Sequence, residues 1–168
     1  MKYIKVFWFL RALLYKPFFF KIGKHCLIGK PLFLCNEKRV TLENRVRIFP
    51  GARLETHEKG SIVICDNVST GQNLHIISSK SCLTINKNTI ISANVFISNI
   101  DHDLNDYDLY IHKQTEIGEG CFIGYGSVIL PGSIIGKNCV IGANSVVKGN
   151  FPDNSIIAGA PARIIRTK

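Results

Sequence analysis

The sequence predicts an all-β solenoid of triangular coils, and three features of its 168 residues lead to this prediction. Aliphatic residues recur every six positions, small residues precede them by two positions, and each interruption follows a multiple of three repeats. Three six-residue repeats per coil describe short strands on the three sides of a triangle. Such coils are stable only when stacked, because each one buries its aliphatic side chains against the next.

The six-residue repeat is most regular toward the C-terminus. Large and small side chains alternate there, as they do in strands that face a narrow core. The cysteines at small positions are therefore predicted to fill the core and not to act as nucleophiles. The aliphatic residues are Ile117, Ile123, Ile129, Ile135, Ile141 and Val147, and the small ones are Thr115, Cys121, Ser127, Ser133, Cys139 and Ser145.

The same repeat extends toward the N-terminus, where insertions separate groups of three repeats. The insertions add two, four, three and fourteen residues, and they follow Leu34, Leu54, Ile76 and Ile97. Because each one comes after the third strand of a coil, all are expected at one corner of the triangle. Six coils are predicted between residues 22 and 147. Asparagines that tolerate positive φ are expected at the turns, namely Asn67, Asn88, Asn94, Asn138 and Asn144.

Residues 1–21 are predicted to form a separate segment, ahead of a solenoid that occupies residues 22–168. The segment is apolar and aromatic but is interrupted by Lys5, Arg11 and Lys16, so it lacks the roughly 20 apolar residues of a membrane-spanning helix. Two compatible interpretations stay open. One is an amphipathic helix on the surface of a membrane, and the other is a helix that caps the open end of the solenoid.

The charge of the chain is concentrated at its N-terminal end. Residues 1–50 carry eleven Lys and Arg against two acidic residues, whereas residues 51–168 carry ten of each. This asymmetry is typical of a protein with one end that meets an anionic surface. A nucleic-acid partner is not expected, because no nucleic-acid-reading motif accompanies the basic residues. Six cysteines without zinc spacing, and no recognisable signal peptide, predict a reduced cytoplasmic setting and no metal site.

The chain resembles the hexapeptide-repeat acyltransferases over about residues 22–166, because of its [LIV]-G-x-[small]-[LIV] repeat. The long loop at 98–114 leaves the coils where galactoside, maltose, serine and antibiotic acetyltransferases carry a catalytic histidine, here His102. The ending Ile157–Arg166 is similar to the G-x-P-A-[KR]-x-[IV] motif of sugar O-acetyltransferases. The resemblance implies a left-handed parallel β-helix with a protruding loop and a C-terminal tail. It also implies a homotrimer with acetyl-CoA bound between subunits.

The activity that the resemblance implies is acetyl-CoA-dependent O-acetylation of a sugar hydroxyl. The pair His102-Asp103 resembles the His-Asp pair found in the branch of the family that acetylates units of bacterial surface polysaccharides, such as O-antigen, capsule or exopolysaccharide. His102 is predicted to act as the general base, since histidine suits this role near neutral pH. A carboxylate or a backbone carbonyl must orient its ring. Asp101 and Asp103 are the candidates, and Asp103 is taken as the catalytic partner.

Five positions are implied by the resemblance to contact acetyl-CoA. Turn amides at Tyr125 and Ala143 match those that hold the pantetheine arm, and Phe122 matches an aromatic residue beside the thioester. Lys148 and Arg163 fall near the positions that meet the nucleotide phosphates, where basic side chains suit a polyanion.

The acceptor pocket is where the sequence departs from the family pattern. Sugar acetyltransferases place an asparagine on the coil before the loop, but this chain has Gly71 there, followed by Gln72 and Asn73. Gln72 and Asn73 are expected to replace it. His75 stands one residue before an inward aliphatic position, so it is expected to point outward on the face of Phe96 and to contact the acceptor.

Three other functions stay as alternatives. N-acetylation of an amino sugar uses the same fold and a base, but it acylates an amine. A γ-type carbonic anhydrase shares the helix, yet the spacing of His75, His102 and His112 does not match its three zinc ligands. A non-catalytic solenoid explains the coils, but it explains neither the loop histidine nor the Gly-Ala-Pro-Ala-Arg ending.

Overall fold

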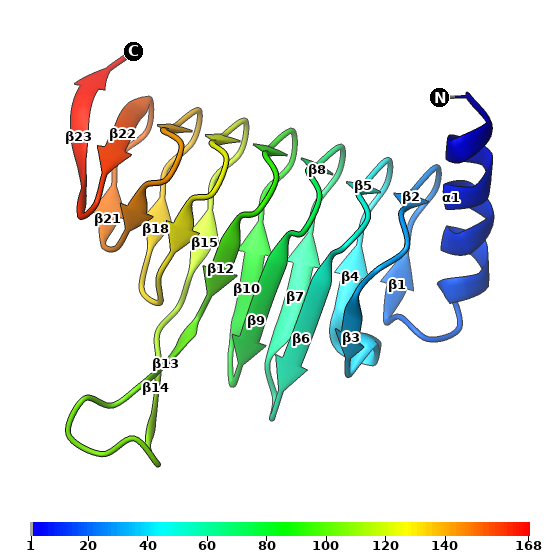
Figure 1. The fold of residues 1–168 in the computed structure, drawn as a ribbon, viewed down its shortest axis with the longest axis horizontal. Coiled ribbons are helices and arrows are strands. Elements are labelled where there is room, and N and C mark those ends of the chain that lie inside the picture. The colour runs from blue at the N-terminus through cyan, green and yellow to red at the C-terminus, as the bar shows by residue number, and fades with distance from the viewer. Residues whose placement is uncertain (1) are drawn as a thin grey trace.

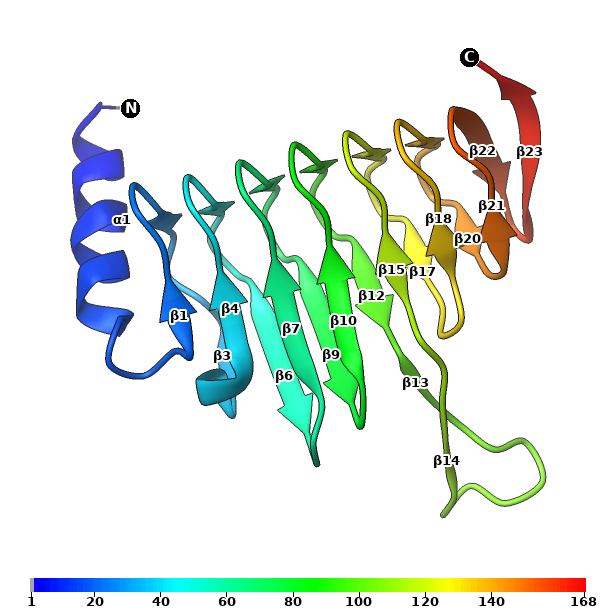
Figure 2. The same cartoon turned by 180° about the vertical axis from the view of Figure 1, so that it is seen from behind.

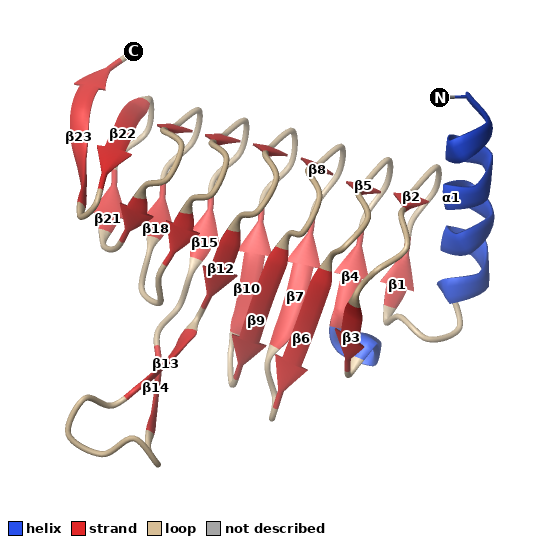
Figure 3. Cartoon of the chain, in the orientation of Figure 1, coloured by secondary structure: helices blue, strands red, loops and turns tan. Residues whose placement is uncertain are grey.

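A computed structural model describes residues 2–168, and it consists of one α-helix followed by a parallel β-helix (Figure 1). Apart from a two-stranded hairpin in the long loop and the antiparallel last strand, the strands form three parallel sheets, one for each side of a triangular coil (Figure 3). The prediction of an all-β, left-handed parallel β-helix is confirmed. Of the predicted N-terminal segment, Met1 lies outside the described residues.

Each side of the triangle is a sheet, and neighbouring strands of a sheet come from successive coils. The first side contains β1 (Lys21–Ile22), β4 (Val40–Leu42), β7 (Ser61–Ile64), β10 (Cys82–Ile85), β15 (Glu116–Ile117), β18 (Ile134–Ile135) and β21 (Asn150–Phe151). The second side contains β2 (Leu27–Ile28), β5 (Arg47–Ile48), β8 (Ser69–Thr70), β11 (Ile90–Ile91), β16 (Phe122–Ile123), β19 (Val140–Ile141), β22 (Ser155–Gly159) and β23 (Ala162–Thr167). The third side contains β3 (Phe33–Cys35), β6 (Arg53–His57), β9 (His75–Ser79), β12 (Phe96–Ser98), β17 (Val128–Ile129) and β20 (Val146–Val147).

The chain completes the six predicted coils and then begins a seventh with β21 and β22. Phe151 and Ile157 are buried at the inward positions of this extra coil. The repeat missed it because Phe151 follows Val147 after only four residues. The last strand, β23, turns back and pairs with β22 in antiparallel fashion, which ends the solenoid.

The long insertion does not disturb the stacking of the coils. Ile85 of β10 lies directly beside Ile117 of β15, although the whole loop separates them in sequence. Ile97 likewise lies beside Ile129. The coils on either side therefore keep one register, as the repeat predicts, and the loop is supported by a continuous stack.

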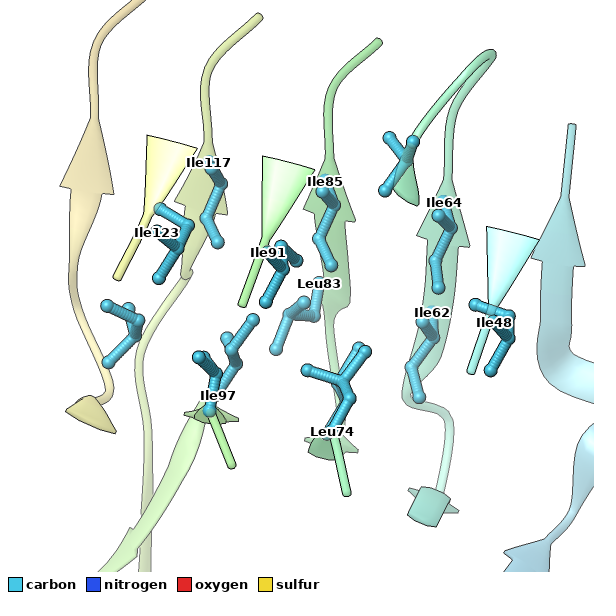
Figure 4. Packing of buried hydrophobic residues seen from close by; sticks show 14 of the residues in the cluster. Ile48, Ile62, Ile64, Leu74, Leu83, Ile85, Ile91, Ile97, Ile117 and Ile123 are labelled. Carbon is cyan, nitrogen blue, oxygen red and sulfur yellow. The ribbon is translucent and has the colours of Figure 1, made fainter. Parts of the chain in front are cut away.

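The core is a stack of aliphatic side chains inside the triangle (Figure 4). Ile123 and Ile141 are fully buried, as predicted. Cys121 and Cys139 fill small inward positions, and burial raises the pKa of the Cys121 thiol to about 12. A thiol with so high a pKa is almost entirely protonated at neutral pH, so the assignment as core filler is supported.

All the insertions leave from the corner between the third and first sides, as predicted. This corner carries the short 3-10 helix η1 (Glu37–Arg39), the turns after β6 and β9, and the long loop. In Figures 1 and 2 these segments extend from the same edge of the solenoid. The five asparagines predicted at turns all have positive φ values, between 54° and 61°.

The helix α1 (Lys2–Tyr15) covers the N-terminal end of the solenoid beside β2 (Figure 1). Ala12 is buried, Trp8 packs edge-on against Phe49 with 4.9 Å between ring centroids, and the Arg11 guanidinium donates to the carbonyl of Ile28 at 2.9 Å. In the structure, α1 therefore packs over the first coil, as the capping interpretation expects. Among the described residues, no helix is long and apolar enough to cross a membrane.

Candidate active site

The long loop begins and ends as a two-stranded antiparallel hairpin. β13 (Ile100–His102) pairs with β14 (Tyr110–His112), and His102 lies opposite Tyr110. The two rings are 4.5 Å apart between centroids. This pairing gives the base of the loop a defined backbone, so the side chain of His102 projects from a structured hairpin.

Asn99 anchors the hairpin to the preceding coil, and sequence reasoning missed it. Its side chain is fully buried, and its Oδ1 accepts a hydrogen bond from the Ser79 backbone N–H at 2.8 Å. Its Nδ2 donates to the Ser78 hydroxyl at 3.1 Å and lies within hydrogen-bond distance of both oxygens of Ser81. Its backbone carbonyl accepts from the N–H of Lys113, so Asn99 holds both ends of the hairpin.

The His102 ring is held through Nδ1, which lies 2.7 Å from the backbone carbonyl oxygen of Tyr107. A carbonyl only accepts hydrogen bonds, so Nδ1 carries the proton in the neutral ring. Nε2 then keeps its lone pair. The structure thus supplies the tautomer that a general base at Nε2 requires.

The predicted orienting role of Asp103 is not what the geometry shows. The Asp103 carboxylate accepts from the N–H of Asn105 at 2.7 Å, and that of Asp101 accepts from the N–H of His102 at 2.9 Å. Within the described residues, neither carboxylate makes a hydrogen bond with the imidazole. Both aspartates shape the loop backbone, and the carbonyl of Tyr107 orients the ring.

A cavity of about 490 Å³ lies between the loop and the outer face of the third side. His102 and Tyr110 line it from the loop, and the turn after β6 lines its opposite end. Its floor is largely apolar. The lining residues are His57, Glu58, Ile77, Ser79, Phe96, Ser98, Ile100, Asp101, His102, Tyr110, Leu130 and Pro131.

The residues predicted to bind the acceptor lie elsewhere: in the part of the chain that the structure describes, Gln72, Asn73 and His75 do not line this cavity. Gln72 and Asn73 occupy the corner between the second and third sides, where Asn73 donates to the Asn94 side chain at 2.9 Å. His75 does point outward beside Phe96, but its Nε2 is 2.8 Å from the Glu55 carboxylate.

The residues assigned to acetyl-CoA are spread over two corners and the second side of the triangle. Tyr125 and Ala143 lie in turns between the second and third sides, while Phe122 and Arg163 belong to strands of the second side. Lys148 follows β20 at the insertion corner. A Cβ atom on Gly124 would lie 2.5 Å from the backbone nitrogen of Ala143, so glycine is needed for adjacent turns to stack there. Contact of these residues with acetyl-CoA stays a prediction.

Comparison with known proteins agrees with the six-residue repeat and the fold. Residues 114–149 match the model of the bacterial transferase hexapeptide (six repeats). The putative lipopolysaccharide biosynthesis O-acetyl transferase WbbJ of Escherichia coli (strain K12) is 33% identical over 153 residues, which cover 83% of this chain and 78% of WbbJ.

Solved structures share the fold. AntD, an N-acyltransferase from Bacillus cereus in complex with dTDP and 3-hydroxybutyryl-CoA, has a TM-score of 0.84 at 23% identity, covering 94% of this chain and 88% of AntD. A galactoside acetyltransferase in complex with coenzyme A has a TM-score of 0.62 at 28% identity, covering 94% of this chain and 69% of its own.

Fold, repeat and relatives together define an acyltransferase built on a left-handed parallel β-helix. The chain belongs to the hexapeptide-repeat acetyltransferase family.

Proposed function

We propose that the protein transfers acetyl from acetyl-CoA to a hydroxyl of a sugar in a bacterial surface polysaccharide. The observation that carries the proposal is the His102 ring on the wall of the cavity, with Nδ1 bonded to the Tyr107 carbonyl and Nε2 left as a base. The name of WbbJ supports the acceptor class, and the coenzyme A complex of galactoside acetyltransferase supports the acetyl donor.

His102 has a defined part in each half of this reaction. Its Nε2 takes the proton of the sugar hydroxyl as the oxygen attacks the thioester carbonyl carbon. When the tetrahedral intermediate collapses, the C–S bond breaks and the imidazolium returns its proton to the departing sulfur. The Tyr107 carbonyl keeps Nδ1 protonated throughout, so the same nitrogen accepts and donates the proton.

Acylation of an amino sugar is the second candidate, because AntD is an N-acyltransferase with the same fold. The O-acetyl function is preferred because the relative with the higher sequence identity, WbbJ, is described as an O-acetyl transferase.

Acceptor-dependent release of CoA from acetyl-CoA tests the function directly. We expect release with neutral sugars or polysaccharide fragments, and an ester product that mild alkali cleaves. A stable amide product would instead establish N-acylation. Acetyl-CoA turnover that is the same with and without every acceptor would contradict both candidates.

We further propose that the protein is a homotrimer whose sites lie between subunits. The distribution of the predicted residues supports this, since His102 leaves one corner of the triangle while Tyr125 and Ala143 lie at another. Cyclic symmetry brings one corner of each subunit to a different corner of its neighbour. Light scattering should give three times the chain mass of 18.7 kDa. A stable monomer with full activity would refute the assembly.

We also propose that the protein attaches peripherally to the inner, cytoplasmic face of the membrane through its N-terminal segment. Phe7, Leu14, Phe18 and Phe20 are exposed on or just after α1, although α1 already covers the solenoid with its other face. The basic residues concentrated in positions 1–50 complement anionic lipid headgroups. The six cysteines, all described, are free thiols, in keeping with the cytoplasm.

Vesicle binding tests the attachment without uncapping the solenoid. The double substitution Leu14→Ser and Phe20→Ser removes apolar area that is 71% and 75% exposed, so we expect affinity for anionic vesicles to fall by roughly tenfold or more. Binding of the unaltered chain should weaken with salt. Leu104→Ser, at an exposed residue of the loop, is the matched control. Equal binding by the double variant and the control would contradict the attachment.

A further inference from the structure

The cavity beside His102 extends across several coils. Its lining includes Ser98 of β12, Ser79 of β9 and His57 of β6, which belong to three consecutive strands of the third side. Adjacent strands are about 4.8 Å apart, so the strand of His57 lies about 10 Å from that of Ser98. This length exceeds one sugar ring, and only one ring of an acceptor can have its hydroxyl at His102.

The far end of the cavity carries its own set of polar groups. His57 and Glu58 lie at the turn after β6, and Glu58 Oε1 lies 3.4 Å from the Ser79 hydroxyl, which donates to it. The same oxygen is 3.9 Å from Nε2 of His112, at the base of the loop. An ionised carboxylate accepts hydrogen bonds from hydroxyls, and an imidazole both donates and accepts. These groups suit the hydroxyls of a second ring.

The charges in the cavity disfavour an anionic ligand. The two carboxylates of the lining belong to Glu58 and Asp101, and within the described chain no Lys or Arg lines the cavity. The amino group of Lys80 is 3.9 Å from Glu58, but both side chains are about half exposed, so the pairing is weak. Between the two ends, Ile77, Phe96 and Leu130 offer apolar surface to the C–H face of a sugar.

We propose that His57, Glu58 and Ser79 form a second sugar subsite, which holds a neutral, non-reacting sugar unit while the neighbouring unit is acetylated at His102. The acceptor is then a neutral oligosaccharide of at least two units. This inference rests on the proposed sugar acetyltransferase function. It adds the place where the second sugar unit is bound and the charge of the acceptor.

Kinetics and binding with a defined acceptor panel test the subsite. The panel consists of neutral hexose and 6-deoxyhexose disaccharides, their component monosaccharides, and matching disaccharides with a uronic acid. We expect the best neutral disaccharide to have a KM at least tenfold below that of its monosaccharides, and the acidic disaccharides to be poor acceptors. Glu58→Gln should reduce this disaccharide advantage several-fold, mainly through KM.

Glu37→Gln is the matched control, because Glu37 lies at the same corner one coil earlier and outside the cavity lining. It should keep the disaccharide advantage. Calorimetric binding of the same disaccharides provides a readout that needs no turnover. Failure to acetylate any sugar would overturn the proposed function, whereas acetylation or binding with no gain from a second neutral unit would overturn the subsite alone. An equal effect of Glu58→Gln on monosaccharide and disaccharide KM would also overturn it.

Discussion

Replacement of His102 by alanine is expected to lower kcat by roughly a hundredfold or more, the usual contribution of a general base. The ring lines the cavity and its Nδ1 is bonded to the Tyr107 carbonyl, so the variant loses the Nε2 that takes the proton. Affinity for acetyl-CoA should barely change, because the histidine acts on the acceptor hydroxyl. Steady-state kinetics at saturating acceptor, with calorimetric titration of CoA, measure both quantities.

His25→Asn is a suitable control for this variant. His25 lies at a turn between the first and second sides, has a φ of 57° that asparagine also tolerates, and is outside the cavity lining. It should keep near-normal turnover. The thermal transition of the His102 variant should match that of the unaltered protein, since the loop lies outside the aliphatic stack. Near-normal kcat in a folded His102→Ala enzyme would eliminate this histidine as the base.

Replacement of Asn99 by alanine is expected to lower kcat by roughly tenfold and to destabilise the fold by about 1–3 kcal/mol, the cost of leaving buried hydrogen-bonding groups unpaired. The Ser79 N–H loses its partner in the Asn99 side chain, and the Ser81 carbonyl keeps only the Ser78 hydroxyl and the Ser61 N–H as donors. The hairpin at the start of the loop would no longer be anchored to the preceding coil, so the position of His102 relative to the cavity would vary. Urea denaturation and steady-state kinetics separate the two effects.

Asn105→Ala tests whether any loop asparagine has this effect. Asn105 is exposed near the tip, where its backbone N–H bonds to Asp103, and its side chain is not needed for that contact. Asn99→Asp keeps the acceptor for the Ser79 N–H but removes the donor to Ser78 and Ser81, so its activity should be intermediate. Unchanged stability and kcat in Asn99→Ala would show that the hairpin is anchored by its backbone alone.

The fold was predictable because it is specified by a short sequence pattern that repeats along the chain. A narrow triangular core admits one aliphatic and one small side chain per strand, so the phase of Ile117 fixes that of Ile123 and Ile141. Insertions leave the stack intact only where a strand ends, and because each insertion follows a multiple of three repeats, all of them were predicted at one corner. The seventh coil was missed because the spacing of the repeat shortens before Phe151.

The candidate site was only partly predictable. His102 lies in the longest insertion, and this position identified it as the candidate general base. Its partner is the carbonyl of Tyr107, and a backbone carbonyl has no residue type by which a sequence can reveal it. The far end of the cavity depends on β6 and β9 extending to His57 and Ser79, beyond the two-residue strands of the regular repeat. Because β9 continues to Ser79, His75 at its start lies away from the corner from which the loop leaves.

The sequence carries a signal that indicates Asn99. It follows the inward Ile97 by two residues, at the first corner position of the long insertion. A polar amide at a position this close to the stack must satisfy its hydrogen bonds internally once it is buried. Such a residue is a candidate anchor wherever a long loop leaves a solenoid.

The two ends of the solenoid bear on how the protein avoids growing into a fibre. A stack of parallel strands exposes unpaired backbone groups at its first and last coils, and these can recruit the coils of another molecule. α1 lies over the first coil, whose strands β1 and β2 are only two residues long. At the other end, β23 runs antiparallel along β22 with a register shift, which presents the wrong strand direction for continuing the stack. We infer that the helix and the final hairpin cap the two ends and prevent end-to-end polymerisation. A chain without α1 should be prone to self-assembly.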